Sequence, residues 1–165
     1  KYALLRKRIL ASDFGKSHPL AIPRAATDEE ILRVHDADYW RRMQNGEVSV
    51  KEMRRIGLPW SPQLIERARR SVGGTIETCL AALSDGIAVS LSGGTHHAFR
   101  NRGEGYCVFN DVAVAIRDHS GVEPRLIRGK GGVFEVVMDG KTIFSKHQQG
   151  RFPEEAEVLE KIPSG

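Results

Sequence analysis

The fold and the chemistry of this chain are decided by the stretch Ser90-Leu-Ser-Gly-Gly-Thr-His-His-Ala-Phe99, followed closely by Gly103-Glu-Gly-Tyr-Cys-Val-Phe-Asn-Asp111. The apolar segment Ile87–Leu91 just before the glycines is predicted to be a short β-strand. Ligands gather at the carboxyl ends of strands in open α/β sheets. Because imidazole titrates near neutral pH, His96 and His97 are interpreted as catalytic, in preference to a structural pair.

The longest predicted helix lies immediately before this stretch. Ser61 is a suitable N-cap, Pro62 occupies the first helical position, and Gly86 ends the helix. Gly73-Gly74 lies inside it and costs helix stability, which indicates either a close approach beside the site or, as we favour, tight packing against a sheet. Apolar residues recur at three- and four-residue steps, including Leu64, Ala68, Val72, Ile76 and Cys79, the last expected to be a small buried residue.

Other helix starts are marked by local capping signals. Thr27–Glu30 and Ser49–Glu52 fit the capping box, in which a hydroxyl and a glutamate reciprocally bond backbone N–H groups. Asn110-Asp111 is expected to cap a helix over 112–116 and so to fix the angle at which the histidine loop leaves it. His35 is expected to end a helix and bond locally, with a role in the site as the less favoured interpretation.

The carboxyl part has a different character. Asp139-Gly140 between two β-rich runs predicts a hairpin over residues 131–146. Pro153, followed by acidic residues, predicts a short helix over Glu154–Ile162.

The composition is that of an ordinary globular protein. The chain has 165 residues, 40% of them hydrophobic, which is enough for one core and room for a second small unit. The net charge of +4 is mild, and its arginines (Arg67, Arg69 and Arg70 among them) are interpreted as a solvated helix face, so no direct nucleic-acid partner is expected. Cys79 and Cys107 lack metal or redox spacing, and no signal or membrane segment is found, so the cytoplasm is the expected location.

The motifs of the first 116 residues resemble the histone deacetylase superfamily, in particular its bacterial and organellar members. The resemblance rests on the histidine loop and on Arg33-Val-His-Asp36 with Tyr39, Gly57-Leu-Pro-Trp-Ser-Pro62 and Arg70-Ser-Val-Gly-Gly-Thr75. It implies an α/β fold of the arginase/deacetylase type and a zinc-dependent hydrolysis of acetylated amines such as acetyl-lysine. It further implies that His96 and His97 are the catalytic pair, and that the substrate-binding residues are Gly105, Tyr106 and Cys107.

The zinc ligands that the resemblance implies are not found in this sequence. The family takes them from an Asp-x-His and a later Asp, and the chain contains no Asp-x-His. Asp118, His119, Asp139 and His147 lack the required spacing, and no late tyrosine follows Tyr106. Since a zinc hydrolase needs three protein ligands and an open position, we expect no metal ligand here and no activity of the chain alone.

The segment from 124 to 162 resembles the carboxyl half of the selenoprotein W-like (Rdx) family, which has a thioredoxin-like fold. The redox Cys-x-x-Cys of that family is absent. The sequence therefore predicts a partial deacetylase-like domain over 1–118, a junction over 119–123 and a partial thioredoxin-like segment over 124–165. Such a joining is either natural or an artefact.

Three functions follow from these patterns. The first is a deacetylase-like zinc amidohydrolase that is incomplete by itself. The alternative is a non-catalytic fusion or interaction module, and a redox protein is the weakest. With strands missing, the helix face around Leu64, Ala68, Val72 and Ile76 is expected to be uncovered and to favour self-association.

Overall fold

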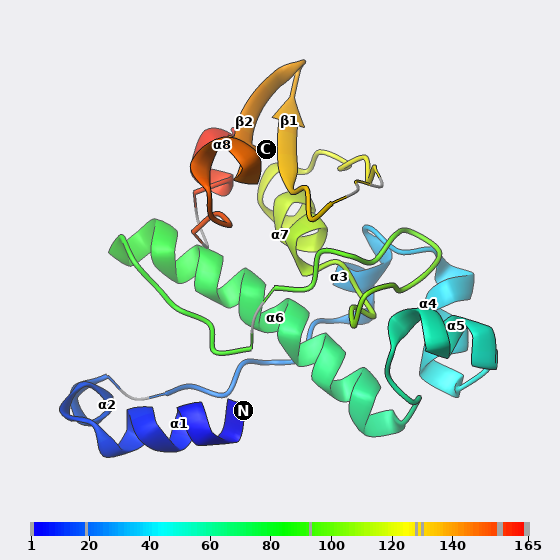
Figure 1. Ribbon diagram of the computed structural model, residues 1–165, viewed down its shortest axis with the longest axis horizontal. Coiled ribbons are helices and arrows are strands. Elements are labelled where there is room, and N and C mark those ends of the chain that lie inside the picture. Colours follow the sequence, from blue (N-terminus) through cyan, green and yellow to red (C-terminus); the bar gives the residue numbers. More distant parts are fainter. Residues whose placement is uncertain are drawn as a thin grey trace.

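The computed structural model describes residues 2–18, 20–92, 94–127, 129, 131–154 and 157–163. The chain is mostly helical and carries a two-stranded antiparallel sheet near its carboxyl end (Figure 1). No helix of the described part is long and apolar enough to cross a membrane. In chain order the elements are α1 (Tyr2–Ala11), α2 (Asp13–Ser17), α3 (Asp28–Leu32), α4 (Ala37–Asn45), α5 (Val50–Ile56), α6 (Pro62–Asp85), α7 (Asp111–Ser120), β1 (Glu135–Met138), β2 (Lys141–Ser145), α8 (Lys146–Gln149) and the 3₁₀ helix η1 (Leu159–Lys161).

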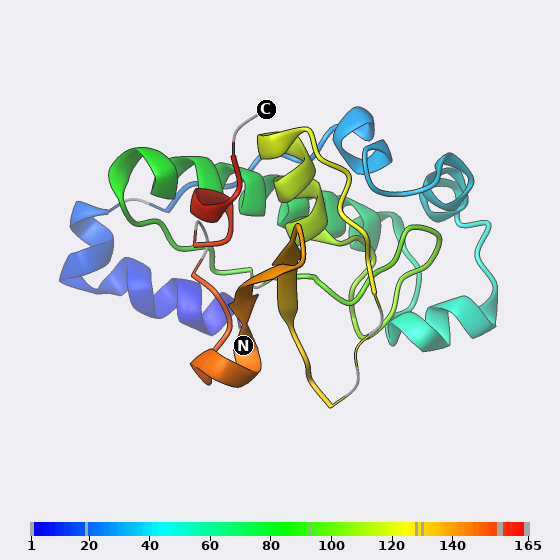
Figure 2. The same cartoon turned by 90° about the horizontal axis from the view of Figure 1, so that it is seen from above.

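The helix α6 is the central element and confirms the predicted long helix. The hydroxyl of Ser61 accepts from the amide of Leu64, Pro62 is the first residue, and Gly86 ends the helix at φ +86°. Since a left-handed C-cap is the conformation that glycine adopts without strain, the helix ends where the sequence predicts. The helix α7 packs against α6, and the hairpin lies beyond α7 (Figures 1 and 2).

The glycine pair in α6 serves close packing. A Cβ atom at Gly73 would lie 2.2 Å from the carbonyl oxygen of Arg24, and one at Gly74 would lie 3.3 Å from the side chain of Pro23. The amide of Ala26 donates to the carbonyl of Arg69 at 3.0 Å, which joins this extended segment to α6. The interpretation as packing is therefore supported, but the glycines face extended chain and not a sheet.

The capping signals are confirmed at α3 and α5. Thr27 with Glu30, and Ser49 with Glu52, each make both bonds of the capping box. The two helices lie near α4, whose Trp40 and Met43 are buried in the main core. Local signals place these helices correctly because the partner groups lie within one turn of each other.

The predicted hairpin is confirmed. Residues Met138 and Lys141 pair across a turn in which Asp139 and Gly140 have φ values of +49° and +77°. Both central residues at positive φ are what a tight two-residue hairpin turn needs. Phe144 of β2 and Ile162 belong to the same buried cluster as Ile116 of α7, so the carboxyl segment shares one core with the helical part. The predicted junction over 119–123 stays a prediction.

Two predicted elements are wrong. Ile87–Leu91 is not a strand, and Ile87 and Val89 are 80% and 76% exposed, because no described strand lies beside it to complete a ladder. The predicted helix over Glu154–Ile162 is only the single turn η1 where the structure describes it; residues 155 and 156 lie outside the described part. Pro153 and Glu154, where the predicted helix would begin, are not helical.

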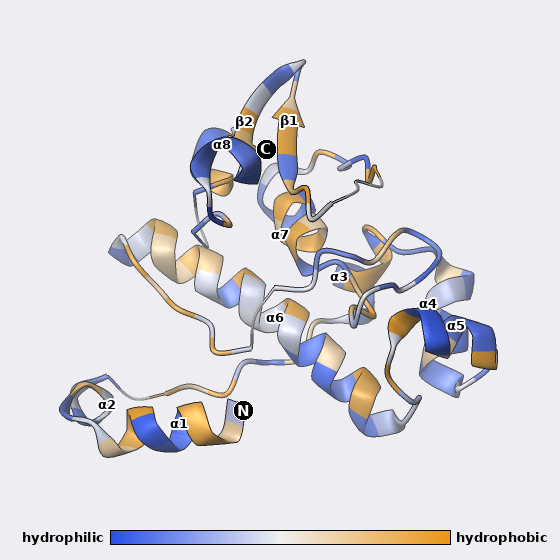
Figure 3. Cartoon of the chain, in the orientation of Figure 1, coloured by the Kyte–Doolittle hydropathy of each residue, from blue (hydrophilic) through white to orange (hydrophobic). Residues whose placement is uncertain are grey.

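The expected uncovered helix face is also wrong. Leu64, Val72 and Ile76 are buried, because the segment before α3 and the helix α7 cover α6. Exposed apolar side chains occur instead at Leu80 within α6, on the segment that follows α6, and on α1, where no residue is buried. Figure 3 shows that α1 carries hydrophobic residues along its length.

Candidate active site

The histidine loop is held by a buried carboxylate at the start of α7. Oxygen Oδ1 of Asp111 accepts from the amides of Thr95 at 2.7 Å and Val112 at 2.8 Å, and Oδ2 accepts from the hydroxyl of Thr75 at 2.8 Å. The amide of Asp111 returns a bond to the carbonyl of Thr95 at 3.1 Å. Burial raises the pKa of this carboxyl, and the three donors oppose that rise. Thr95, one residue before His96, is thereby held where Thr75 of α6 meets Asp111 of α7.

Asn110 holds the other end of the loop and caps α7 as predicted. Its Oδ1 accepts from the amide of Ala113 at 3.0 Å, while its Nδ2 donates to the carbonyls of His96 at 3.2 Å and Ala98 at 2.9 Å. One side chain therefore ends the loop, begins the helix and fixes the backbone on both sides of His97.

His35 also belongs to this hydrogen-bond network. The sequence predicted only local bonds for it at a helix end, but it bonds residues far along the chain. Its Nε2 accepts from the amide of Asn110 at 3.0 Å, so the ring proton belongs on Nδ1, which faces the carbonyl of Arg100 at 3.3 Å. Burial lowers the pKa of His35 to about 4. The neutral ring thus connects both arms of the loop.

The two predicted catalytic histidines lie side by side. The ring centroids of His96 and His97 are 4.1 Å apart, with planes inclined by 49°. Gly105 has φ +56°, and a Cβ atom there would lie 3.3 Å from ring atoms of His97. Gly93 of the loop lies outside the described residues.

The other predicted substrate-binding residues differ in exposure. Tyr106 is 70% exposed at φ +67°, and its amide donates to the carbonyl of Ile56 at 2.7 Å. Cys107 is buried, and burial raises the pKa of its thiol, so this sulfur is a protonated neighbour and not a nucleophile. The structure thus brings Gly105 against His97 and leaves Tyr106 exposed.

Aromatic side chains of the carboxyl segment cover His96. The rings of Phe134 and Phe152 each lie 5.2 Å from that of His96. Burial, then the charges of His97 and Lys146, lower the pKa of His96 to about 4. The imidazole of His96 is therefore neutral at physiological pH.

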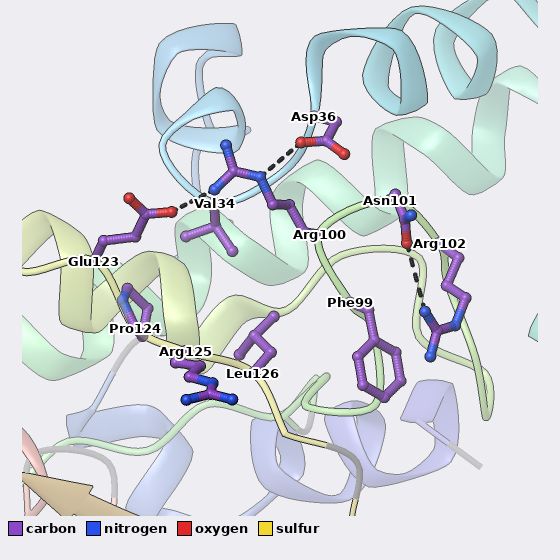
Figure 4. A pocket seen from close by; sticks show the side chains of 10 residues that line it. All are labelled: Val34, Asp36, Phe99, Arg100, Asn101, Arg102, Glu123, Pro124, Arg125 and Leu126. Carbon is purple, nitrogen blue, oxygen red and sulfur yellow. Dashed lines mark hydrogen bonds and ion pairs between the residues drawn. The ribbon is translucent and has the colours of Figure 1, made fainter.

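Two cavities flank the site. One of about 320 Å³ lies beside His96, between α6, α7 and the carboxyl segment. The other, about 520 Å³, is shown in Figure 4. Its Arg100 makes ion pairs with Asp36 and Glu123, and Arg102 lies over the ring of Phe99. Arg125 also lines this cavity, so its wall carries three arginines against two acidic residues, and both of these acids pair with Arg100.

The described residues do not fit a zinc site. No group of three or more His, Cys, Asp or Glu side chains within them could hold a metal ion. The rings of His96 and His97 lie against one another with their planes inclined by 49°, and the oxygens of Asp111 accept hydrogen bonds from three donors. No chemical step in this chain is therefore assigned to a metal.

Sequence reasoning missed several neighbours of the histidines. Thr75, Phe134, Phe152 and Lys146 come from positions far along the chain, and no local pattern links them to the loop. The sequence offered one signal: Thr75 places a hydroxyl on the buried face of α6, one turn after Val72, and a buried hydroxyl needs a hydrogen-bond partner.

A family model described as histone deacetylase domain matches residues 1–125. An uncharacterized protein of Picosynechococcus sp. is 35% identical over 164 residues, which cover 93% of this chain and 54% of that protein. The acetoin utilization protein AcuC of Bacillus subtilis is 36% identical over 68% of this chain and 31% of its own length.

A crystal structure of a histone deacetylase homologue from Aquifex aeolicus is similar, with a TM-score of 0.56 and 26% identity. It aligns with 71% of this chain and 33% of its own. The same values apply to a structure of a histone deacetylase homologue complexed with SAHA. The chain thus spans about half the length of one of these relatives and about a third of the others.

Proposed function

The chain belongs to the histone deacetylase family, and from that premise we propose that it carries the proton-transfer half of a site that hydrolyses acetylated amines, with acetyl-lysine as the representative substrate. The observation that carries the proposal is the adjacent pair of rings of His96 and His97, in a loop whose backbone is fixed by Asn110 and Asp111. A catalytic constellation needs such fixed positions to be effective.

The two rings divide the proton transfers of amide hydrolysis. A neutral His96 accepts the proton of the water that attacks the amide carbon. His97 donates a proton to the nitrogen as the carbon–nitrogen bond breaks, which releases the amine and the acid. Gly105, which lies close against His97, is proposed to bind the acyl group together with its neighbours Tyr106 and Cys107.

The chain alone is proposed to be inactive. The family uses zinc, and the described residues supply no ligand set for it. A partner polypeptide with these ligands would complete the site.

The alternative is a non-catalytic interaction module. It is favoured by the cover that Phe134 and Phe152 form over His96. The selenoprotein W-like resemblance of 124–162 stays a prediction, since the family model that matches is the histone deacetylase domain and it covers residues 1–125.

A cytoplasmic location, without a nucleic-acid or membrane partner, belongs to the proposal. Cys79 and Cys107 form no disulfide, which supports a reducing compartment. Self-association is proposed through the exposed apolar residues Leu80, Ile87 and Val89.

Complementation tests the proposal. The chain is mixed with the part of the Bacillus subtilis relative that it does not cover, and hydrolysis of an acetyl-lysine reporter is measured. We expect activity only in the mixture, and a loss of about 100- to 10,000-fold with His97→Ala. The matched control is His147→Ala, at an exposed position on α8, which leaves the rate unchanged. Hydrolysis by the chain alone, removed by a chelator, would contradict the incomplete site.

A further inference from the structure

The cavity of about 520 Å³ lies between two stretches of backbone, the turn over residues 99–102 and the irregular segment 123–126 (Figure 4). Val34 and Asp36 complete its lining. None of the described residues that line it also lines the cavity beside His96. The cavity is therefore separate from the histidine pair, and what it binds goes beyond the proposed function. Its volume is that of a small-molecule site.

The two walls of this cavity are joined by the side chain of Arg100. The amide of Phe99 donates to the carbonyl of Arg102 at 2.8 Å, which closes the turn of the first wall. The amide of Asp36 donates to the carbonyl of Arg100 at 2.9 Å. The guanidinium of Arg100 pairs with Asp36 and with Glu123 of the second wall. Arg100 thus uses both acids of the lining and holds the walls together.

The other two arginines of the lining stand on different walls. Arg102 belongs to the turn, and Arg125 belongs to the segment 123–126. In the view of Figure 4 the side chains of Phe99 and Leu126 lie between these two arginines, and the ion pairs of Arg100 lie apart from them, at the top. The cavity therefore carries a guanidinium on each side and apolar surface in the middle.

Both of these arginines keep hydrogen-bond donors for a ligand. The guanidinium of Arg102 lies 3.9 Å from the centroid of the Phe99 ring, so its face is covered while its N–H groups stay open at the edge. Its Nε is 3.8 Å from Oε2 of Glu104, which is outside the lining, and its Nη1 is 3.5 Å from Oδ1 of Asn101, so both contacts are weak. Arg125 is exposed and has no hydrogen bond or ion pair within the described part of the chain.

Two guanidinium groups with apolar side chains between them are complementary to a ligand that has an anionic group at each end. A guanidinium pairs with a carboxylate through two parallel hydrogen bonds, so one carboxylate matches each arginine. Two phosphates would bring up to about four negative charges to a lining that already contains Asp36 and Glu123. Charge therefore favours carboxylates over phosphates, and the apolar middle favours a spacer of methylene groups.

We propose that this cavity binds an α,ω-dicarboxylic acid with an apolar spacer, one carboxylate on Arg102 and the other on Arg125. The methylene groups of the spacer lie against Phe99 and Leu126. Adipate is a suitable probe, because its ten or so heavy atoms are fewer than the roughly seventeen waters whose liquid volume the cavity equals.

Binding of adipate to the full chain, measured by calorimetry, tests the proposal. Hexanoate has the same number of carbons but one carboxylate, and malonate has two carboxylates with a single methylene between them. Since each lacks either one arginine pair or the spacer, adipate should bind at least about tenfold tighter than either. Equal affinities for adipate and hexanoate, or for adipate and malonate, would overturn the proposal.

Two arginine variants locate the carboxylates. Arg102→Gln and Arg125→Gln should each weaken adipate by about tenfold or more, so that it binds no tighter than hexanoate binds to the unchanged chain. The matched control is Arg67→Gln, at an exposed position of α6 outside the lining, which should leave adipate binding unchanged. Unfolding curves verify that all three variants are folded. Undiminished adipate binding in either folded cavity variant would overturn the proposal.

The NMR signals of the arginine Nε–H groups show the contact without any substitution. Adipate should shift the signals of Arg102 and Arg125 at concentrations that leave the signal of Arg67 in place. Equal shifts of all three signals would mean that the acid acts only as a mobile counterion, and this result would also contradict the proposal.

Discussion

Two neighbouring segments of one motif, residues 87–91 and 94–111, differ in how firmly the rest of the chain holds them. The first segment is extended and exposed, with Val89 76% exposed. The second is fixed by Asp111, Asn110 and His35. The difference teaches that a strand depends on neighbouring chain for its ladder, whereas this loop draws its hydrogen bonds from helices that the chain contains.

The largest effect on this contrast is expected from Asp111→Ala. The substitution leaves the amides of Thr95 and Val112 and the hydroxyl of Thr75 without their buried acceptor. We expect a loss of about 3 kcal/mol or more in the free energy of unfolding. Chemical denaturation measures it. Asp111→Asn keeps the shape and an acceptor oxygen and should lose less; a smaller loss for Ala than for Asn would contradict the role of Asp111 as acceptor.

His35 is expected to make the second largest contribution, as a pH dependence. Its folded pKa of about 4 lies below its ordinary value of 6.5, so the unfolded state binds more protons between these values. The stabilisation is complete above pH 6.5 and is lost as the pH falls toward 4, by up to about 3 kcal/mol. Denaturation at a series of pH values should show this slope, and His35→Gln should reduce it to the part that His96 contributes, since the pKa of His96 is also lowered to about 4. An identical slope in a folded His35→Gln protein would rule His35 out as its source.

The smallest effect is expected in the segment before the loop. Val89→Thr changes an exposed side chain that packs against little, so the free energy of unfolding should change by less than about 0.5 kcal/mol. The thermal unfolding curve of Val89→Thr, compared with those of the unchanged chain and the Asp111 variants, measures this change. A loss near 2 kcal/mol would mean that this segment is packed in solution.

The sequence-based predictions succeeded where the determining groups are close in the chain. Caps at Ser61, Thr27 and Asn110 and the Asp139-Gly140 turn were predicted because each is completed within a few residues. The strand at 87–91 failed because periodicity does not reveal whether a partner strand exists.

The site was predicted only in part for the same reason. The adjacent histidine rings and the approach of Gly105 to His97 follow from one short motif. The cover by Phe134 and Phe152 arises from packing between distant segments, and no spacing in the sequence reports it.

Residue-by-residue amide hydrogen exchange tests the central claim most directly, namely that the chain holds its histidine loop by its own residues. We expect slow exchange for the amides of Thr95 and Asn110, which donate to Asp111 and His35 respectively. We expect exchange near the rate of unfolded chain for residues 87–91. If Thr95 and Asn110 exchange as fast as Val89, the loop is not preorganised and the account is wrong.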